Sequence, residues 1–222
     1  MPTYPIGPET RRLRHRAFTP DDADALYRLN SHPEVMRYTC EPMLTSVAEA
    51  RQAIIDYPDF RQHGFGRWAC VLKSTDQIIG FCGLKYLDEF QAVDVGYRFF
   101  PEFWGQGLAT EACRASVEFG FTTLQLPRIL AFAIAENKAS IRVLQKTGFA
   151  SHGPTECSGV CALRFEQQHP GLPDLPGAAA VREARTTTDA THAHHATDAG
   201  EVADGAGAPH TPSNPATEPG PS

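Results

Sequence analysis

The sequence has no long hydrophobic run and no recognisable leader segment. A membrane-spanning helix needs about 20 consecutive apolar residues, and no stretch of this 222-residue chain approaches that length. The first residues, MPTYPIGP, lack the apolar core of a signal peptide. We therefore expect a cytoplasmic protein that has no membrane partner.

The chain also lacks an excess of basic residues, since its formal net charge is −6. Binding to a phosphate backbone requires clustered cations, so we expect no nucleic-acid partner. The one basic cluster, residues 11–16, alternates around Leu13 and His15 as a β-strand does. This cluster is either a solvated strand face or an anion site, and the alternation favours the solvated face.

The six cysteines show no C-x-x-C spacing. Cys70 and Cys82 lie within apolar runs, which is typical of buried, reduced thiols. Cys157 and Cys161 are close together but have no neighbouring partner ligands, so we expect no metal site. Three histidines at positions 192–195 indicate only unselective metal binding.

Apolar residues are concentrated in the first 166 positions. Residues 167–222 are mostly Ala, Gly, Pro, Thr, Asp and His and show no apolar period. Such a segment cannot bury enough surface to offset the entropy lost on ordering. We expect one domain over residues 1–166, followed by a disordered tail over residues 167–222.

Periodicity and capping signals within the domain predict an α+β fold with a mixed sheet. The predicted helices cover residues 23–29, a segment from 46 to about 57, 107–121 and 138–147. The predicted strands cover residues 13–18, 67–72, 78–84, 92–100, 128–134 and 159–165.

A glycine-rich turn joins the strand at 92–100 to the helix at 107–121. Gly105 and Gly107 remove side chains where the helix begins, so backbone N–H groups and the helix dipole can bind a pyrophosphate. No third glycine completes G-x-G-x-x-G, and no Gly-Lys-Ser/Thr follows, so the dinucleotide and P-loop versions fit poorly. By itself, such a turn would equally suit any α/β unit.

Residues 101–112 (PEFWGQGLATEA) resemble the coenzyme A motif, Q/R-x-x-G-x-G/A, of the GNAT acetyltransferase superfamily, and in particular its RimJ/RimL-type branch. The resemblance runs from about residue 11 to 165 and implies a mostly antiparallel sheet with one splayed parallel strand pair, flanked by helices. It implies that the turn binds acetyl-CoA. The implied contact residues are Trp104, Gly105, Gln106, Gly107, Leu108, Ala109 and Thr110. Trp104 departs from the Gln or Arg of the motif, which removes one side-chain contact but leaves the amides.

The same resemblance implies that the pantetheine arm enters between the strands at 92–100 and 128–134. By position, it would contact the backbone of Tyr97 and Phe99 and the side chain of Asn137. Asn137 could also cap the following helix, and the two roles are compatible. Gly96 marks either a β-bulge that lets the strand splay or a place that accommodates a large neighbouring side chain.

Acetyl transfer to an amine needs a base for the amine and a proton donor for the departing thiolate. Many relatives carry a tyrosine acid where this chain has Leu144, so we expect Ser140 to donate the proton, as the Asn-x-x-Ser pattern of the branch suggests. Asp94 is the first candidate for the base and Glu89 the second. Both could instead be plain surface acids, and a mid-helix serine is more often inert.

Together these features predict an acetyl-CoA-dependent N-acetyltransferase that needs no metal and works by direct attack in a ternary complex. Its acceptor would be a protein N-terminal α-amine or a small-molecule amine. The alternative is a catalytically inactive acyl-CoA-binding module that acts through a partner. Both a monomer and a homodimer are compatible with the sequence.

Overall fold

The structure is a computed structural model that describes residues 3–39, 41–157 and 159–171. Residues 172–222, most of the predicted tail, lie outside the described residues. The helices are α1 (Ala23–Asn30), α2 (Pro33–Met36), α3 (Val47–Asp56), α4 (Asp59–Gln62), α5 (Leu108–Thr122) and α6 (Lys138–Lys146), with short 3-10 turns η1 (Pro20–Asp22) and η2 (Pro101–Phe103). The strands are β1 (Leu13–Arg16), β2 (Arg67–Leu72), β3 (Gln77–Leu87), β4 (Ala92–Phe99), β5 (Arg128–Ala133), β6 (Ala150–Cys157) and β7 (Val160–Gln168).

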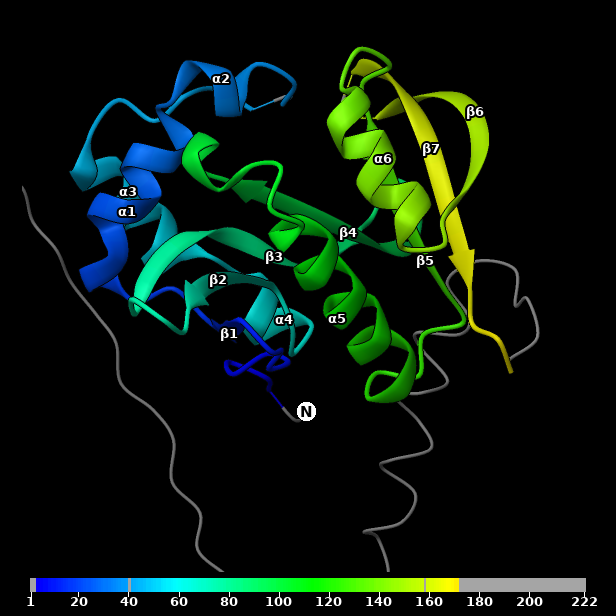
Figure 1. The fold of residues 1–222 in the computed structure, drawn as a ribbon, viewed down its shortest axis with the longest axis horizontal. Coiled ribbons are helices and arrows are strands. Elements are labelled where there is room, and N and C mark those ends of the chain that lie inside the picture. The colour runs from blue at the N-terminus through cyan, green and yellow to red at the C-terminus, as the bar shows by residue number, and fades with distance from the viewer. Residues whose placement is uncertain (1–2, 40, 158, 172–222) are drawn as a thin grey trace, which may run out of the picture.

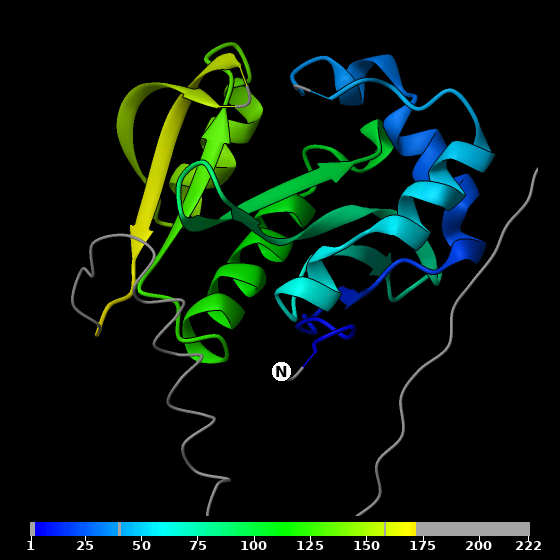
Figure 2. The same ribbon diagram turned by 180° about the vertical axis from the view of Figure 1, so that it is seen from behind.

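The seven strands form one sheet in the order β1-β2-β3-β4-β5-β7-β6. Every neighbouring pair is antiparallel except β4 and β5, which are parallel. Helix α5 crosses one face of the sheet, and the views from both sides show β4 and β5 diverging toward their C-terminal ends (Figures 1 and 2). The predicted mixed sheet with one splayed parallel pair is confirmed.

The main core lies between α5 and the sheet. Cys113 and Val117 of α5 pack in one buried cluster with Trp68, Leu84 and further strand residues. Each fully buried large side chain of this kind contributes about 1.5–3 kcal/mol. This packing fixes the start of α5 against the end of β4, because both elements are anchored in the same core.

Local signals placed the helix ends correctly. The Ser46 side chain accepts a hydrogen bond from the Glu49 N–H (3.1 Å) at the start of α3. Gly148, with φ 93°, follows α6 in the left-handed conformation that a C′ glycine adopts. Leu13 and His15 are buried, so the basic cluster at 11–16 is indeed the alternating first strand.

Among the described residues, two short helices and one strand were missed. The helices α2 and α4 were not predicted, and neither was the strand β6. A proline is unfavourable inside a central strand, but β6, which contains Pro154, is the outer strand of the sheet, where a proline is tolerated. The hairpin of β6 and β7 also extends the folded region to Gln168, two residues beyond the predicted domain end.

Of the two expectations for Gly96, the bulge is wrong and room for a large neighbouring side chain is right. The register between β3 and β4 runs without a shift from Gly80↔Phe99 to Leu87↔Ala92. A Cβ atom at Gly96 would lie 2.6 Å from Nη2 of Arg67. Gly96 is therefore a glycine because the Arg67 side chain crosses the strand at this point.

Candidate active site

The gap between β4 and β5 begins directly after their one register pair, Asp94↔Leu130. Leu84 of β3, the register partner of Val95, donates its N–H away from β4, to the Gly66 carbonyl on the β2 side (3.2 Å). The backbone N–H and C=O of Val95 therefore point away from β3, toward β5. Because backbone groups alternate along a strand, the N–H and C=O of Tyr97 and Phe99 then face the gap. Those are the two positions predicted to contact the pantetheine arm.

Trp104 already forms a hydrogen bond with one of these backbone groups. Its indole N–H donates to the Phe99 carbonyl oxygen (2.7 Å), while 48% of the residue remains exposed. The Phe99 N–H therefore remains available to a ligand in the gap, whereas the Phe99 carbonyl oxygen already has a hydrogen-bond partner in Trp104. The tryptophan that replaces the motif's Gln or Arg thus ties the turn to the end of β4.

The turn has the geometry of an anion cradle. Gly105 and Gly107 both adopt the left-handed conformation, with φ 74° and 77°. Gly107 is the N-cap of α5, so the next N–H groups point out of the helix end. A Cβ atom at Gly105 would meet no atom within 4 Å, so the turn is open to space at this residue.

The predicted proton donor lies across the gap, in the first turn of α6. Asn137 caps this helix, and its side-chain oxygen accepts from the Ser140 N–H (3.0 Å). The Tyr97 hydroxyl lies 3.0 Å from Ser140 Oγ and 3.1 Å from the Ser140 carbonyl oxygen. Burial raises the pKa of the Tyr97 hydroxyl far above its usual value, so the group stays protonated.

The Tyr97 hydroxyl was missed at the sequence level. Tyr97 was assigned only a backbone role, and 43 residues separate it from Ser140. No local pattern could join the two side chains, because their contact depends on how α6 packs beside the β4 edge.

Asp94 and Arg67 form a buried ion pair beside the gap. Nη2 of Arg67 lies 2.8 Å and 3.0 Å from the two Asp94 carboxylate oxygens, and Asp94 is 8% exposed. Burial raises the pKa of the Asp94 carboxyl, and the Arg67 guanidinium opposes this rise without cancelling it. The sequence indicated Asp94 but not its arginine partner.

These parts line one cavity of about 1070 Å³. Its lining includes Asp94, Tyr97, Phe99, Trp104, Gly105, Gly107, Leu108, Ala109, Thr110, Asn137 and Ser140. The remaining walls come from α1, α2, α3 and the segment between α2 and α3 on one side, and from β3, β5 and α6 on the other. In Figure 1, α1 and α2 lie on the β4 side of the diverging strands and α6 on the β5 side.

The acetyltransferase (GNAT) domain family matches residues 12–150. The chain belongs to the GNAT acetyltransferase family. It is 36% identical to the uncharacterized N-acetyltransferase p20 of Bacillus licheniformis over 146 residues, which is 65% of this chain and 82% of that protein. Members of this family are acetyl-CoA-dependent enzymes, so the chain is an N-acetyltransferase, as predicted.

Two solved structures share the fold at low sequence identity. One is the ribosomal-protein-S5-alanine acetyltransferase of Vibrio fischeri, with TM-score 0.62, 20% identity, and coverage of 75% of this chain and 98% of that one. The other is the spermidine N-acetyltransferase of Vibrio cholerae in complex with CoA and spermine, with TM-score 0.61, 18% identity, and coverage of 72% and 97%. At these identities the likeness shows the GNAT fold alone.

Within this GNAT fold, two predicted residues lie outside the cavity lining. Glu89 is exposed in the turn between β3 and β4, so the structure does not bring it to the gap. Gln106 points its side chain to the Glu102 carbonyl oxygen (2.8 Å). Any contribution of Gln106 to coenzyme binding would therefore come from its backbone.

Leu144 occupies the place where many GNAT relatives carry a tyrosine, and it is 1% exposed. A buried leucine offers no proton, whereas the Tyr97 and Ser140 hydroxyls lie 3.0 Å apart in the lining of the same cavity. Cys70 and Cys82 are free and buried as predicted. Burial raises the pKa of the Cys82 thiol to about 11, so it stays protonated.

No group of three or more His, Cys, Asp or Glu side chains suited to a metal occurs within residues 3–39, 41–157 and 159–171. The same residues include no helix that is long and apolar enough to cross a membrane.

Proposed function

We propose that this protein transfers the acetyl group of acetyl-CoA to a primary amine by direct attack within a ternary complex. The observation that carries this proposal is the shared cavity. The glycine turn before α5, the open edge of β4 and the Tyr97–Ser140 hydroxyl pair all line this same cavity. Acetyl-CoA, when bound, supplies the activated acetyl thioester.

In this proposal, the backbone amides from Gly105 to Thr110 hold the pyrophosphate, helped by the positive end of the α5 dipole. The backbone groups of Tyr97 and the N–H of Phe99 hold the pantetheine arm as an added strand would be held. Asn137 contributes its amide nitrogen, because its oxygen already caps α6. The open space before Gly105 fits a bulky phosphate group.

Ser140 would protonate the departing thiolate, and the Tyr97 hydroxyl would support Ser140 through a hydrogen bond. The Tyr97 hydroxyl stays protonated and lies 3.0 Å from Ser140 Oγ, so it can donate a hydrogen bond that stabilises a serine oxygen giving up its proton. A short hydroxyl chain of this kind does for the thiolate what a single tyrosine does in relatives. It also explains how the family reaction proceeds with Leu144 in the tyrosine's place.

Asp94 would receive the proton from the attacking amine. An ionised carboxylate has about four lone-pair sites, so the two bonds from Arg67 leave acceptor capacity toward the cavity. A raised pKa moves the carboxyl toward the range in which a general base works best. Arg67 fixes the direction of the carboxylate.

The acceptor would be a protein N-terminal α-amine or a small-molecule amine. Relatives of both kinds share the fold, since one structural neighbour is named for a ribosomal protein and the other for spermidine. Among the described residues, the carboxylates that line the cavity are Glu34, Glu41 and Asp94. Glu41 pairs with Arg98 (2.9 Å) and Asp94 pairs with Arg67. Because arginines neutralise these two carboxylates, the charge of the cavity lining does not by itself favour a polycationic acceptor over a protein N-terminus.

The test is thiol release from acetyl-CoA by the full 222-residue chain, measured against N-terminal peptides, spermidine and other small amines. Turnover should be selective for one acceptor class. Ser140→Ala should lower kcat by about a hundredfold or more, in the range typical of general acid catalysis, with the Kd for CoA unchanged. Ser151→Ala, an exposed serine on β6, is the matched control and should behave as the wild type.

Three results would contradict the proposal at different points. Absence of CoA binding would rule out the role of the α5 turn. Tight CoA binding without turnover on any amine would rule out transfer to these acceptor classes. An unchanged kcat in Ser140→Ala would show that another group protonates the thiolate.

A further inference from the structure

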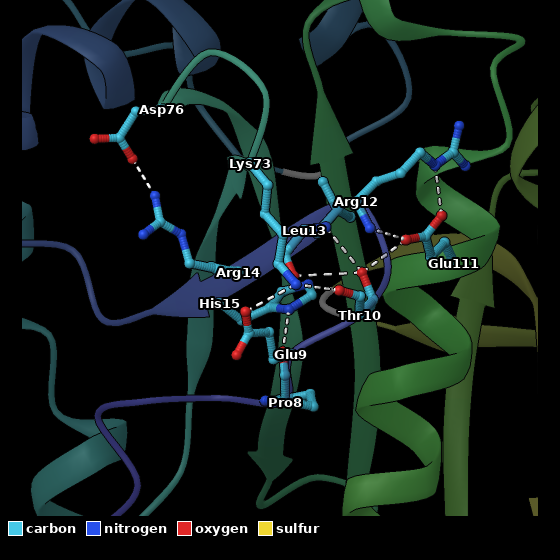
Figure 3. Close-up of polar contacts among 10 residues, drawn as sticks. All are labelled: Pro8, Glu9, Thr10, Arg12, Leu13, Arg14, His15, Lys73, Asp76 and Glu111. Carbon is cyan, nitrogen blue, oxygen red and sulfur yellow. Dashed lines mark hydrogen bonds and ion pairs between the residues drawn. The ribbon is translucent and has the colours of Figure 1, made fainter.

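The start of β1 is tied to the first turn of α5 by three polar residues (Figure 3). The Glu111 carboxylate accepts from the Thr10 hydroxyl (2.7 Å), the Arg12 backbone N–H (2.9 Å) and the Arg12 Nε–H (2.7 Å). About a hundred residues separate the two segments in sequence. Glu111 therefore joins the N-terminal segment to the helix end that forms the cradle.

The Arg12 guanidinium also holds the turn itself. Its Nη1 donates to the Gln106 carbonyl oxygen (3.0 Å), and its Nη2 lies 3.7 Å from where a Cβ atom of Gly107 would be. In a trans peptide the C=O and the following N–H point in opposite directions. By holding the Gln106 C=O, Arg12 directs the Gly107 N–H the opposite way, away from the guanidinium.

Arg12 is not one of the cavity-lining residues, whereas Gly105, Gly107 and Leu108 are. The guanidinium thus lies behind the turn, and the N–H that it orients faces the cavity. Gly107 has no side chain and adopts φ 77°, so the peptide orientation has no local anchor of its own. Arg12 supplies that anchor from the distant segment that precedes β1.

Charge gives Arg12 a second role. Partial burial raises the pKa of the Glu111 carboxyl, but the hydrogen bonds from Thr10 and Arg12 outweigh this and lower it, so Glu111 is ionised at neutral pH. An ionised carboxylate in the first turn of α5 opposes any second anion at the same helix end. Arg12 neutralises that carboxylate directly (2.7 Å).

We propose that Arg12 is a positioning residue for the pyrophosphate end of acetyl-CoA. It holds the Gly107 peptide in its binding orientation and neutralises Glu111. This inference rests on the proposed role of the α5 turn. It differs from a purely structural tie between β1 and α5, because it requires a specific loss of affinity for the phosphate-bearing part of the coenzyme.

The experiment compares two acetyl donors and a matched arginine. In Arg12→Ala, the KM for acetyl-CoA and the Kd for CoA should rise about tenfold, which corresponds to about 1.4 kcal/mol. The KM for acetyl-pantetheine, which lacks the pyrophosphate, and kcat at saturating acetyl-CoA should not change. Arg14→Ala is the control, because Arg14 lies two residues further on, in β1, and pairs with the exposed Asp76 at the surface.

Two further variants separate the roles of Arg12. Arg12→Lys keeps the charge but cannot bridge Glu111 and Gln106 with a planar fork, so it should lose CoA affinity by about threefold. This variant also covers the case in which Arg12→Ala does not fold. In the Arg12→Ala background, Glu111→Gln should recover part of the lost affinity, because it removes the uncompensated anion.

Equal losses with both acetyl donors, or a CoA affinity equal to that of Arg14→Ala, would overturn the inference. Binding of CoA to the wild-type chain is measured in the same series. Its absence would instead refute the proposed function of the turn, so the two failures are distinguishable.

Discussion

Replacing Gly96 by alanine tests why this position lacks a side chain. The new methyl carbon would lie 2.6 Å from Nη2 and 2.7 Å from Cζ of Arg67, closer than non-bonded atoms normally approach. The guanidinium cannot withdraw freely, because it also donates to the Gly83 carbonyl oxygen and to both oxygens of Asp94. Accommodating the methyl therefore strains or breaks the buried ion pair.

Two typical costs bracket the expected loss of stability in Gly96→Ala. Overpacking a well-filled site costs about 1–3 kcal/mol, and breaking a buried ion pair costs about 3–5 kcal/mol. The long Arg67 side chain can absorb part of the displacement, so we expect the free energy of unfolding to fall by about 2 kcal/mol, within the overpacking range. Urea unfolding followed by fluorescence or circular dichroism measures this value.

The control is Gly171→Ala, where a Cβ atom would approach only the His169 ring, at 3.8 Å, and the stability should change by less than about 0.5 kcal/mol. The penalty at Gly96 should also shrink in an Arg67→Met background, since the colliding guanidinium is then absent. A Gly96→Ala protein as stable as the wild type, or a penalty that persists without the guanidinium, would refute the reasoning.

Two further predictions concern the hydroxyl pair and Glu111. Tyr97→Phe should lower kcat about tenfold, less than the 10²–10⁴-fold typical of general acid catalysis, and leave the KM for acetyl-CoA unchanged. Tyr86→Phe on β3 is the control. An equal effect of both substitutions would exclude a specific role of the Tyr97 hydroxyl. Because the folded-state pKa of Glu111 is lowered from 4.5, its contribution to stability is complete above that pH and is lost as the pH falls through the folded-state pKa. The wild type should thus lose stability more steeply than Glu111→Gln on acidification below about pH 4.5 in urea titrations, and parallel curves would contradict this.

Much of the fold was predictable because its signals are local. The Ser46 cap, the glycine at position 148 and the alternation around Leu13 each depend on residues within one or two turns of chain. The hairpin strand β6 was missed because the effect of Pro154 depends on whether its strand is central or at the sheet edge. That distinction belongs to the sheet order and not to the segment.

The candidate site was predictable only in part. The turn at Gly105 and Gly107 was recognised because consecutive residues form it, and Ser140 because it follows Asn137 at a fixed spacing. The partners of these residues were not recognised. Arg67 opposite Asp94 and Tyr97 opposite Ser140 come from different strands and helices, and their contacts arise only when the sheet assembles.

The sequence by itself determined the family, the mixed sheet and the glycine turn at the start of α5, because their signals lie in contiguous residues. Only the tertiary structure decided that Gly96 accommodates Arg67, that the Tyr97 hydroxyl meets Ser140, and that Arg12 holds the turn from behind. The physical reason is that hydrogen bonds and ion pairs between distant segments depend on packing geometry to within a few tenths of an ångström, and sequence spacing carries no such information.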